Sequence, residues 1–393
     1  MSLFLCLYPH CVIRKNANAV LLYNTDSGKR IITQEPTIVQ TITEASNCIE
    51  VIDNHLIESF WMQCVDFEMG FMVECLSKPI ISTPINKIIT SVEKEIRALG
   101  YLSQSHSNSF LNQVTVQTEN TLDKGLSDFA YGIIDYPCQG NLFISGSLNL
   151  DWINNFESLE TLIISGDVKY YDIPNILARV TNSNVVVVFK SFADFYSEKE
   201  VNKIVSIYSN VFFEFLFDKM LDVRLLKDIS DNRYYNENVF INLLIEDSQI
   251  IDNIISTEGV EYKVTPIFNN RELNDKLKNE LYVTLADLDN MKKSVKEILI
   301  QEQINTSCFG NLCIKQNGDV TCWGQLLGNI NTSDLVKLIN HWVSKSSDCC
   351  WFKTREQHTK CSECLYNILC PPISIYEEMG IIESACGSNI QIL

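Results

Sequence analysis

Three cysteines lie within ten residues near the end of the sequence, at Cys361, Cys364 and Cys370 in the stretch K-C-S-E-C-L-Y-N-I-L-C-P-P. Two thiolates separated by two residues can bind one metal, because a turn brings both to the same side of the chain. Cys386 is the only cysteine further along and would complete a set of four. Four thiolates suit either a zinc ion or an iron–sulfur cluster, and the sequence does not separate the two.

A second group of thiols precedes this one. Cys308, Cys313 and Cys322 are candidate ligands of a second metal site, and the adjacent pair Cys349 and Cys350 lies nearby in the sequence. Neighbouring cysteines rarely bind the same ion without strain, so the fourth ligand is not identified. Buried thiols with no metal are an equally good explanation of this group.

The other cysteines are scattered. Of the 15 in the sequence, nine fall between Cys308 and Cys386 and six within the first 140 residues. Cys64 and Cys75 have apolar neighbours and are expected to be small core residues. The first residues lack a basic flank and a small-residue cleavage site, which predicts no signal peptide and a reducing, cytoplasmic location. Thiols or metal ligands are expected there rather than disulfides.

The composition excludes several classes of function. The 393 residues are 46% hydrophobic and 20% charged, which indicates folded domains, two or three of them. The formal net charge of −18 and the lack of clustered Lys and Arg argue against nucleic acid as a partner. No apolar stretch approaches the ~18 residues of a membrane-spanning helix.

The first predicted domain, residues 1–105, resembles a small winged-helix unit. Strands at Ala19–Asn24 and Lys29–Thr33 flank a turn and form a hairpin. Helices are predicted after Pro36 and over Phe60–Cys75. The outer strand of such a hairpin leaves backbone groups unpaired, so it can accept another chain as an added strand.

The second predicted domain, residues 106–300, alternates strands and helices. The strands are apolar throughout, as expected where both faces are buried, and a helix is predicted at Ser197–Tyr208. This pattern predicts an α/β fold with a parallel sheet, and six strands predict a partial (β/α) barrel. No Gly-rich phosphate loop occurs. The predicted strands are Val114–Thr118, Thr161–Ser165, Val185–Phe189, Val211–Phe217, Val239–Ile245 and Tyr262–Phe268.

The third predicted domain, residues 301–393, holds the clustered thiols. It begins with a hairpin around Asn317-Gly318 and a helix at Ser333–Ser344. The stretch C-S-E-C-L-Y-N-I-L-C-P-P, preceded by F-G-N-L-C-I-K-Q-N-G-D-V-T-C-W-G, resembles a SPASM domain. That domain is the auxiliary-cluster module appended to many radical-SAM peptide maturases.

The resemblance implies ligands for two clusters. Its usual run is C-x2-C-x5-C-x3-C followed by a distant cysteine. By this likeness Cys361, Cys364, Cys370 and Cys386 would hold a [4Fe-4S] cluster, with zinc as the alternative. Cys308, Cys313 and Cys322 resemble ligands of the other cluster. Ser374 stands where its fourth cysteine is expected, so that set is incomplete.

The middle of the chain departs from the radical-SAM pattern. The family carries C-x3-C-x2-C after the first barrel strand, and this motif is absent from the sequence. The corresponding loop holds a single cysteine, Cys138, and Ser165-Gly166-Asp167 replaces a Gly-Gly-Glu motif. One thiolate cannot hold the cluster that binds S-adenosylmethionine, so no cleavage of that cofactor is expected.

Nearly the full length resembles the pseudo-radical-SAM/SPASM proteins of bacterial ribosomal-peptide (RiPP) systems. The likeness includes A-V-L-L-Y-N-T-D-S-G-K near the start and P-I-F-N-N-R-E-L at Pro266. It implies a catalytically degenerate accessory role, with a precursor peptide and a partner radical-SAM maturase as binding partners. The first domain would be the peptide-recognition element. Its expected peptide-binding residues are Lys29, Arg30, Ile31, Ile32 and Thr33 on the outer strand and Phe60, Trp61, Cys64 and Phe67 on the helix.

Other readings remain open. The helix with Phe60 can equally be an ordinary core helix. The chain can be an iron–sulfur electron carrier for the maturase. It can also be an enzyme that uses the barrel for unrelated chemistry, with Asp128, Asp135 and Asp167 at the end where barrels place their catalytic groups. The histidines match no catalytic motif, although His358 lies three residues before Cys361.

Overall fold

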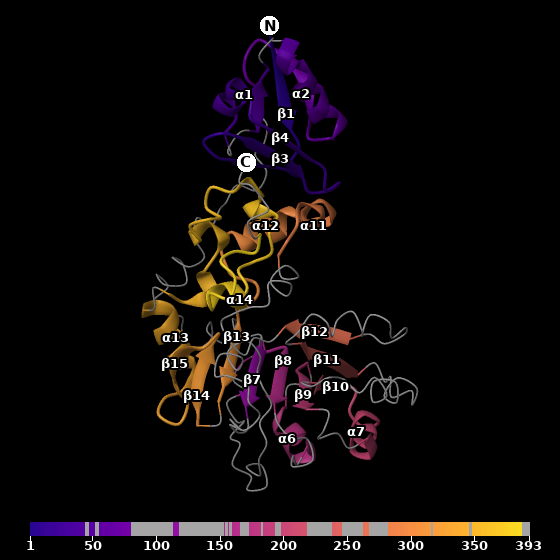
Figure 1. The fold of residues 1–393 in the computed structure, drawn as a ribbon, viewed down its shortest axis with the longest axis vertical. Coiled ribbons are helices and arrows are strands. Elements are labelled where there is room, and N and C mark those ends of the chain that lie inside the picture. Colours follow the sequence, from indigo (N-terminus) through magenta and orange to yellow (C-terminus); the bar gives the residue numbers. More distant parts are fainter. Residues whose placement is uncertain are drawn as a thin grey trace. The chain divides into compact units, whose positions relative to one another are not determined.

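The computed structural model divides into two compact units, whose elements are labelled in Figure 1. The first comprises Met1–Glu95, Leu281–Ser307 and Phe352–Leu393, and the second comprises Ile96–Glu280 and Cys308–Trp351. The three-domain division stays a prediction, since contacts group the N-terminal segment with the end of the chain. The residues described are 1–43, 47–51, 55–79, 113–117, 153, 156, 159–165, 173–181, 184–192, 198–217, 238–245, 262–266, 282–315, 317–345 and 348–386.

The first unit begins with two antiparallel sheets and two helices. One sheet has the order β5-β1-β6 and the other β2-β3-β4. The predicted hairpin is confirmed as β3 and β4, and the helix after Pro36 is confirmed as α1. The bounds are β1 Ser2–Leu7, β2 Cys11–Lys15, β3 Val20–Asn24, β4 Arg30–Thr33, α1 Pro36–Thr41, β5 Cys48–Glu50, α2 His55–Asp66 and β6 Gly70–Cys75.

The helix predicted over Phe60–Cys75 is wrong in its second half. It ends at Asp66, and Gly70–Cys75 forms strand β6 against β1. Glu68 has a φ of 56°, which reverses the chain after the helix. A Cβ at Gly70 would lie 2.2 Å from the carbonyl oxygen of Cys6, so only glycine allows this close approach of the two strands.

Strand β3 is buried on both faces, because alternate residues enter two different cores. Val20 and Leu22 pack in the core with α1 and α2. Leu21 and Tyr23 pack in a second core against Leu365 and other residues from the end of the chain. The N-terminal hairpin and the cysteine-rich segment therefore share a core, which the sequence does not predict.

Short elements build the rest of the first unit. Helices α11 (Leu285–Asn290) and α12 (Val295–Gln301) each begin with a capping box, formed by Thr284 with Asp287 and by Ser294 with Glu297. The tail contains α14 (Ile375–Glu378) and the short 3₁₀ helices η7 (Arg355–Gln357) and η8 (Leu365–Ile368). A further 3₁₀ turn, η6 (Cys350–Phe352), lies at the boundary of the two units.

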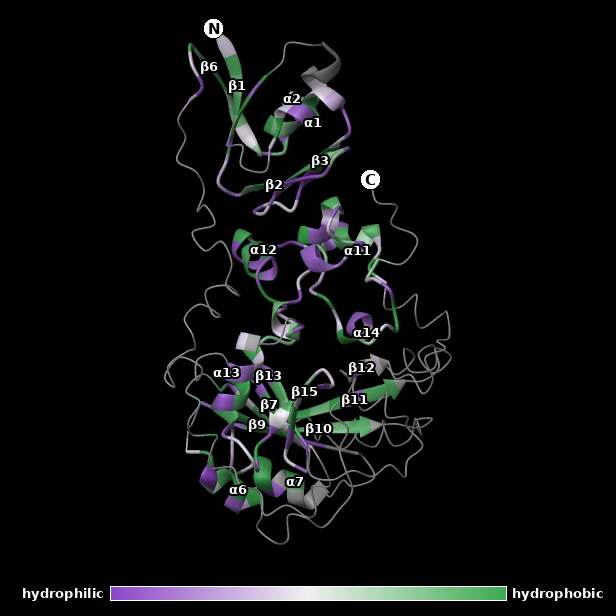
Figure 2. Ribbon diagram, turned by 90° about the vertical axis from the view of Figure 1, so that its left-hand side faces the viewer, coloured by the Kyte–Doolittle hydropathy of each residue, from purple (hydrophilic) through white to green (hydrophobic). Residues whose placement is uncertain are grey.

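The second unit is built on a nine-stranded sheet of order β12-β11-β10-β9-β8-β7-β13-β14-β15. Strands β7 to β12 are parallel and consecutive, which confirms the predicted α/β sheet and all six strand positions to within three residues at their ends. Figure 2 shows β10 and β11 in the green of hydrophobic residues, as expected for strands covered on both sides. The bounds are β7 Gln113–Gln117, β8 Thr161–Ser165, α6 Ile173–Arg179, β9 Val186–Phe192, α7 Glu198–Val205, β10 Val211–Phe217, β11 Val239–Ile245 and β12 Tyr262–Pro266.

The start of the predicted third domain extends this sheet. Strand β13 (Asn311–Ile314) pairs in parallel with β7, and β14 (Asp319–Cys322) and β15 (Gln325–Asn329) follow antiparallel. The predicted hairpin around Asn317-Gly318 and the following helix, α13 (Leu335–Lys345), are both confirmed. In the part of the chain that is described, no helix is long and apolar enough to cross a membrane.

Candidate metal centre

Consecutive tight turns set the spacing of the tail thiols. The amide of Cys361 donates to the carbonyl of His358 at 2.8 Å, and the amide of Cys364 donates to that of Cys361 at 3.1 Å. Cys364 precedes η8, and the amide of Cys370 donates to the carbonyl of Tyr366 at 3.0 Å at its end. The C-x2-C-x5-C spacing therefore corresponds to two turns of backbone, one before and one after η8.

The four predicted tail ligands lie in one neighbourhood. Burial raises the pKa of Cys361, Cys364 and Cys370, that of Cys370 to about 12. Charge on other members of the set, Cys386 included, raises these pKa values further, and every pair among the four interacts in this way. Such mutual repulsion is expected of thiolates that face one position, and it is relieved when a metal takes up their charge.

The spacing of the tail sulfur atoms helps to separate the two kinds of metal site. Ligands of a single tetrahedral zinc ion lie about 3.8 Å apart, since each zinc–sulfur bond is about 2.3 Å. Among the described residues, no three of the tail thiols have sulfur atoms that all lie within 4.8 Å of one another. An iron–sulfur cluster binds each thiolate to a different iron and so holds the sulfur atoms farther apart. The tail thiols are therefore not drawn together to the spacing that a single tetrahedral ion imposes.

Arg355 joins the segments that supply these thiols. Its guanidinium donates to the carbonyls of Pro371 at 2.6 Å and Pro372 at 3.1 Å, and to both carboxylate oxygens of Glu377. A further contact, of 3.8 Å, joins the guanidinium to the sulfur of Cys361. The side chain is 7% exposed, so a fixed positive charge lies beside the thiols in a largely dry site.

Glu377 connects Arg355 to the last ligand. Its carboxylate accepts from the amide of Ala385 at 2.8 Å, next to Cys386, and from the amide of Ser374 at 2.9 Å. Ser374 is the N-cap of α14 and forms a capping box with Glu377. Ser374, which stands where the resemblance predicts a cysteine, therefore caps α14.

A second cation lies beside Cys370. The ammonium of Lys293 donates to the carbonyl of Cys370 and to the side-chain oxygen of Gln301, both at 2.5 Å. Desolvation lowers the pKa of Lys293 to about 8. A small pocket, partly open to solvent, adjoins this region and is lined by residues including Cys370, Arg355 and Asn367. Both cations offset negative charge that would build up on ligated thiolates.

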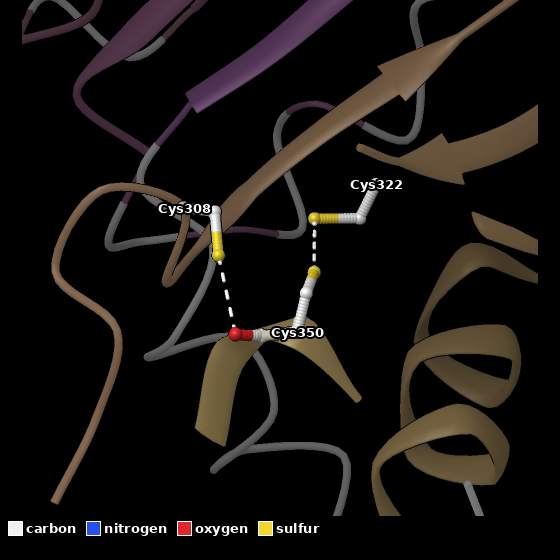
Figure 3. A group of neighbouring side chains, drawn as sticks. All are labelled: Cys308, Cys322 and Cys350. Carbon is white, nitrogen blue, oxygen red and sulfur yellow. Dashed lines mark hydrogen bonds between the residues drawn. The ribbon is translucent and has the colours of Figure 1, made fainter. Parts of the chain in front are cut away.

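The predicted second thiol group forms, with one change of membership. Cys308, Cys322 and Cys350 are buried, and their sulfur atoms all lie within 4.8 Å of one another. Figure 3 shows the three side chains converging from the turn before β13, the end of β14 and η6. The sulfur atoms of Cys322 and Cys350 are 3.0 Å apart, and the thiol of Cys308 donates to the carbonyl of Cys350 at 3.4 Å.

Cys313 is not part of this group, and strand geometry explains why. Cys313 is paired with Thr321 across the hairpin, so these two side chains share a face. Cys322 follows Thr321 and therefore points to the opposite face. Cys350, which the sequence left without a role, takes the third position. The observed register, with Cys313 opposite Thr321 and Ile314 opposite Val320, is what separates Cys313 from Cys322, and it is not evident from the sequence.

The residues expected to bind a peptide have mixed surroundings. Strand β4 is an edge strand among the described residues, but Lys29 lies over the ring of Phe67 and Arg30 lies over Tyr366 and pairs with Asp289. Ile31 is buried, whereas Ile32 and Thr33 are half-buried. On α2, the side chains of Phe60, Trp61 and Cys64 belong to the hydrophobic core, and Phe67 packs against that core. A role for these four in peptide binding stays a prediction.

The parallel sheet contains a chain of polar side chains that the sequence does not reveal. Lys190 on β9 lies 3.8 Å from the carboxylate of Glu214 on β10, which accepts from Asn242 on β11 at 2.6 Å. Thr265 on β12 donates to Asn242 at 2.8 Å. Cys138 and the candidate carboxylates Asp128, Asp135 and Asp167 lie outside the described residues.

The chain is similar to solved structures at low sequence identity. No family model matches the chain, and no curated protein matches it. Similar solved structures include SuiB of Streptococcus suis bound to its precursor peptide SuiA, bound to S-adenosylmethionine, and SuiB itself. They are 13–14% identical, with 97% of each chain covered and TM-scores of 0.42, 0.41 and 0.39 respectively. Likeness at this level transfers neither site residues nor an activity.

Proposed function

We propose that this chain is a catalytically degenerate radical-SAM-like accessory protein that binds a precursor peptide, a partner radical-SAM maturase, or both, during ribosomal-peptide biosynthesis. The observation that carries this proposal is a contrast within one chain. The tail keeps four thiols, with Arg355 in contact with Cys361 and Glu377 hydrogen-bonded to the residue before Cys386, whereas the sequence contains no C-x3-C-x2-C motif with which a barrel could hold a cofactor-cleaving cluster.

The tail thiols are the proposed ligands of a [4Fe-4S] cluster. Cys361, Cys364, Cys370 and Cys386 would bind it, and the cluster would supply electron transfer or a rigid structural anchor. Arg355 and Lys293 place two positive charges beside the ligands, which stabilises an anionic cluster. A zinc ion is the alternative occupant and would serve only to stabilise the fold.

We place peptide binding at the edge of β4, which pairs only with β3 among the described residues. The amide of Asn24 donates to the carbonyl of Lys29 at 2.9 Å, which makes this a hydrogen-bonded pair of the hairpin. Such pairs alternate along an antiparallel ladder, so the backbone of Ile31 faces β3 and that of Arg30 and Ile32 faces outward. An extended peptide can add to this edge through those outward groups.

Calorimetry tests this function directly. The chain is purified without oxygen and titrated with synthetic copies of the short peptides encoded beside its gene, and separately with the neighbouring maturase. Saturable binding to at least one of them is expected, together with no cleavage of S-adenosylmethionine under reducing conditions. Cleavage of the cofactor by the chain alone, or lack of binding to every partner tested, would remove the proposal.

An electron-carrier role for the maturase is the second candidate, and the set of four tail thiols, three of them buried, favours it. Iron and acid-labile sulfide are measured in the anaerobic protein, and the reduced protein is then mixed with the oxidised maturase. Four irons and four sulfides per chain with electron transfer to the maturase are expected on this reading. Zinc in place of iron would exclude it and leave a structural role for the site.

A further inference from the structure

The thiol group of the second unit differs from the tail group in the spacing of its sulfur atoms. Cys308, Cys322 and Cys350 have their sulfur atoms within 4.8 Å of one another, which is near the spacing of about 3.8 Å that a single tetrahedral ion imposes. A multi-iron cluster would need these sulfur atoms farther apart, because each would bind a different iron. The sulfur atoms of this group therefore lie closer together than any three of the tail thiols do.

The number of thiols argues against a simple disulfide. A bond between Cys322 and Cys350 would use two of the sulfur atoms and leave the buried Cys308 beside it without a chemical role. Three converging thiols, in contrast, supply three of the four ligands of a structural zinc site. The fourth ligand is not assigned, because the buried Cys349 is adjacent to Cys350 and neighbouring cysteines rarely bind one ion without strain.

Aromatic side chains cover the residues next to the ligands. Trp351 follows Cys350 and packs edge-on against Trp342 of α13, with ring centres 5.2 Å apart. Phe309 follows Cys308 and packs against Trp351 at 5.3 Å. Cys308 and Cys350 are fully buried and Cys322 is 2% exposed. A dry, closed surrounding of this kind is typical of structural rather than catalytic metal sites.

We propose that Cys308, Cys322 and Cys350 hold a single soft divalent ion, zinc in the reducing cell, as a site separate from the tail cluster. On binding, the ion forms three metal–sulfur bonds and the three thiol protons leave to solvent, without any change of oxidation state. The ion ties together the turn before β13, the end of β14 and η6, and so fixes the antiparallel extension to the edge of the parallel sheet.

The test counts zinc in a chain whose tail site has been removed. The Cys361→Ser/Cys364→Ser background is produced with both zinc and iron in the medium and purified without oxygen. One zinc per chain is expected in this background. Adding Cys350→Ser or Cys322→Ser should reduce zinc at least tenfold, whereas adding Cys313→Ser should leave it unchanged, because Cys313 lies on the opposite face of the hairpin.

X-ray absorption at the zinc edge gives a second measurement that needs no variant. In the unaltered chain, a sulfur shell at about 2.3 Å without a metal–metal distance is expected. Equal zinc in the Cys350→Ser and Cys313→Ser chains, an absence of zinc from the folded background, or a Cys322–Cys350 disulfide in protein kept without oxygen would each overturn the proposal. Iron in the tail is counted separately, so the result does not depend on the proposed function.

Discussion

The guanidinium of Arg355 donates two parallel hydrogen bonds, of 2.6 and 3.0 Å, to the carboxylate of Glu377. Both side chains are almost fully buried. Paired bonds of this geometry are among the strongest that side chains make. Removing one member of a buried ion pair leaves the other charge in a dry site without its partner. We therefore expect the Arg355–Glu377 pair to be required for the stability of the folded tail.

Glu377→Gln is expected to destabilise the first unit by about 3–5 kcal/mol, the usual cost of breaking a buried pair. Chemical denaturation of the metal-free chain, followed by circular dichroism, measures the change. Glu383→Gln is the matched control, because Glu383 pairs with Lys360 at the surface, where such pairs contribute about 0–1 kcal/mol. Equal effects of the two substitutions would show that the Arg355–Glu377 pair does not hold the tail together.

The protonation of the Glu377 carboxylate is expected to make the stability of the chain depend on pH. Burial alone would raise the pKa of Glu377, but hydrogen bonds and charge from Arg355, with hydrogen bonds from Ser374, outweigh it and hold the pKa below its usual value. A group whose pKa is lowered by folding contributes stability above its unfolded pKa and loses it as the pH falls through the folded value. The stability of the metal-free chain should thus decline below about pH 4.5.

Comparison of two chains isolates this contribution. The difference in unfolding free energy between the unaltered chain and Glu377→Gln should be constant from pH 7 to pH 5 and shrink at lower pH. Denaturation curves at four or more pH values measure it. A difference that grows as the pH falls would mean that the carboxylate is protonated in the folded state, contrary to the geometry of its donors.

The elements that the sequence predicts well are those decided by local chemistry. Apolar runs such as Val211–Phe217 and Val239–Ile245 form strands because burial on both faces selects β-branched and aromatic residues. The turn at Asn317-Gly318 is likewise local, since Gly318 has a φ of 86° that other residues resist. The break between α2 and β6 was missed because it depends on how closely Gly70 approaches Cys6 in space.

The candidate sites are predicted only in part, for the same reason. Spacing singled out the tail thiols, whose turns lie within a few residues of one another, and their binding of a metal stays a prediction. It did not identify Cys350, which joins Cys322 from 28 residues away through the packing of η6. Spacing also did not show that β3 shares a core with Leu365 and Leu369. Contacts between residues so far apart in the sequence leave no periodic pattern in it.

The core shared by β3 and the tail predicts that a destabilising substitution in the tail also destabilises β3. Cys364 belongs to the core that also contains Leu21 and Tyr23, and the hydroxyl of Tyr23 accepts from the amide of Lys293 at 2.9 Å. Cys364→Ser should therefore lower hydrogen-exchange protection in Val20–Asn24 as well as in residues 352–386. Strands β9 and β10, in the other unit, should keep theirs.

Hydrogen exchange read by mass spectrometry resolves these segments. The effect should be largest in metal-loaded protein, since structural thiolate sites contribute on the order of 10 kcal/mol in small zinc-binding peptides. Cys75→Ser, at a half-buried position on β6, is the control and should leave both segments protected. Loss of protection in the tail alone would show that the hairpin folds without it.

The edge of β4 provides the sharpest prediction about function. The amide of Ile32 is expected to face the open edge, so Ile32→Pro removes a donor that a bound peptide would need without removing one that β3 uses. Proline is tolerated on edge strands for this reason. The substitution should weaken binding of the precursor peptide at least tenfold in calorimetry while changing the melting temperature little.

A matched pair of variants separates loss of the edge from loss of the fold. Ile31→Pro removes an amide that faces β3 and should destabilise the hairpin itself, whereas Ile32→Ala trims the same side chain but keeps the outward amide. Peptide affinity should survive Ile32→Ala and fall only with Ile32→Pro. If Ile32→Ala weakens binding as much as Ile32→Pro does, the side chain rather than the strand edge makes the contact. Strand addition at β4 is then the wrong mode of recognition.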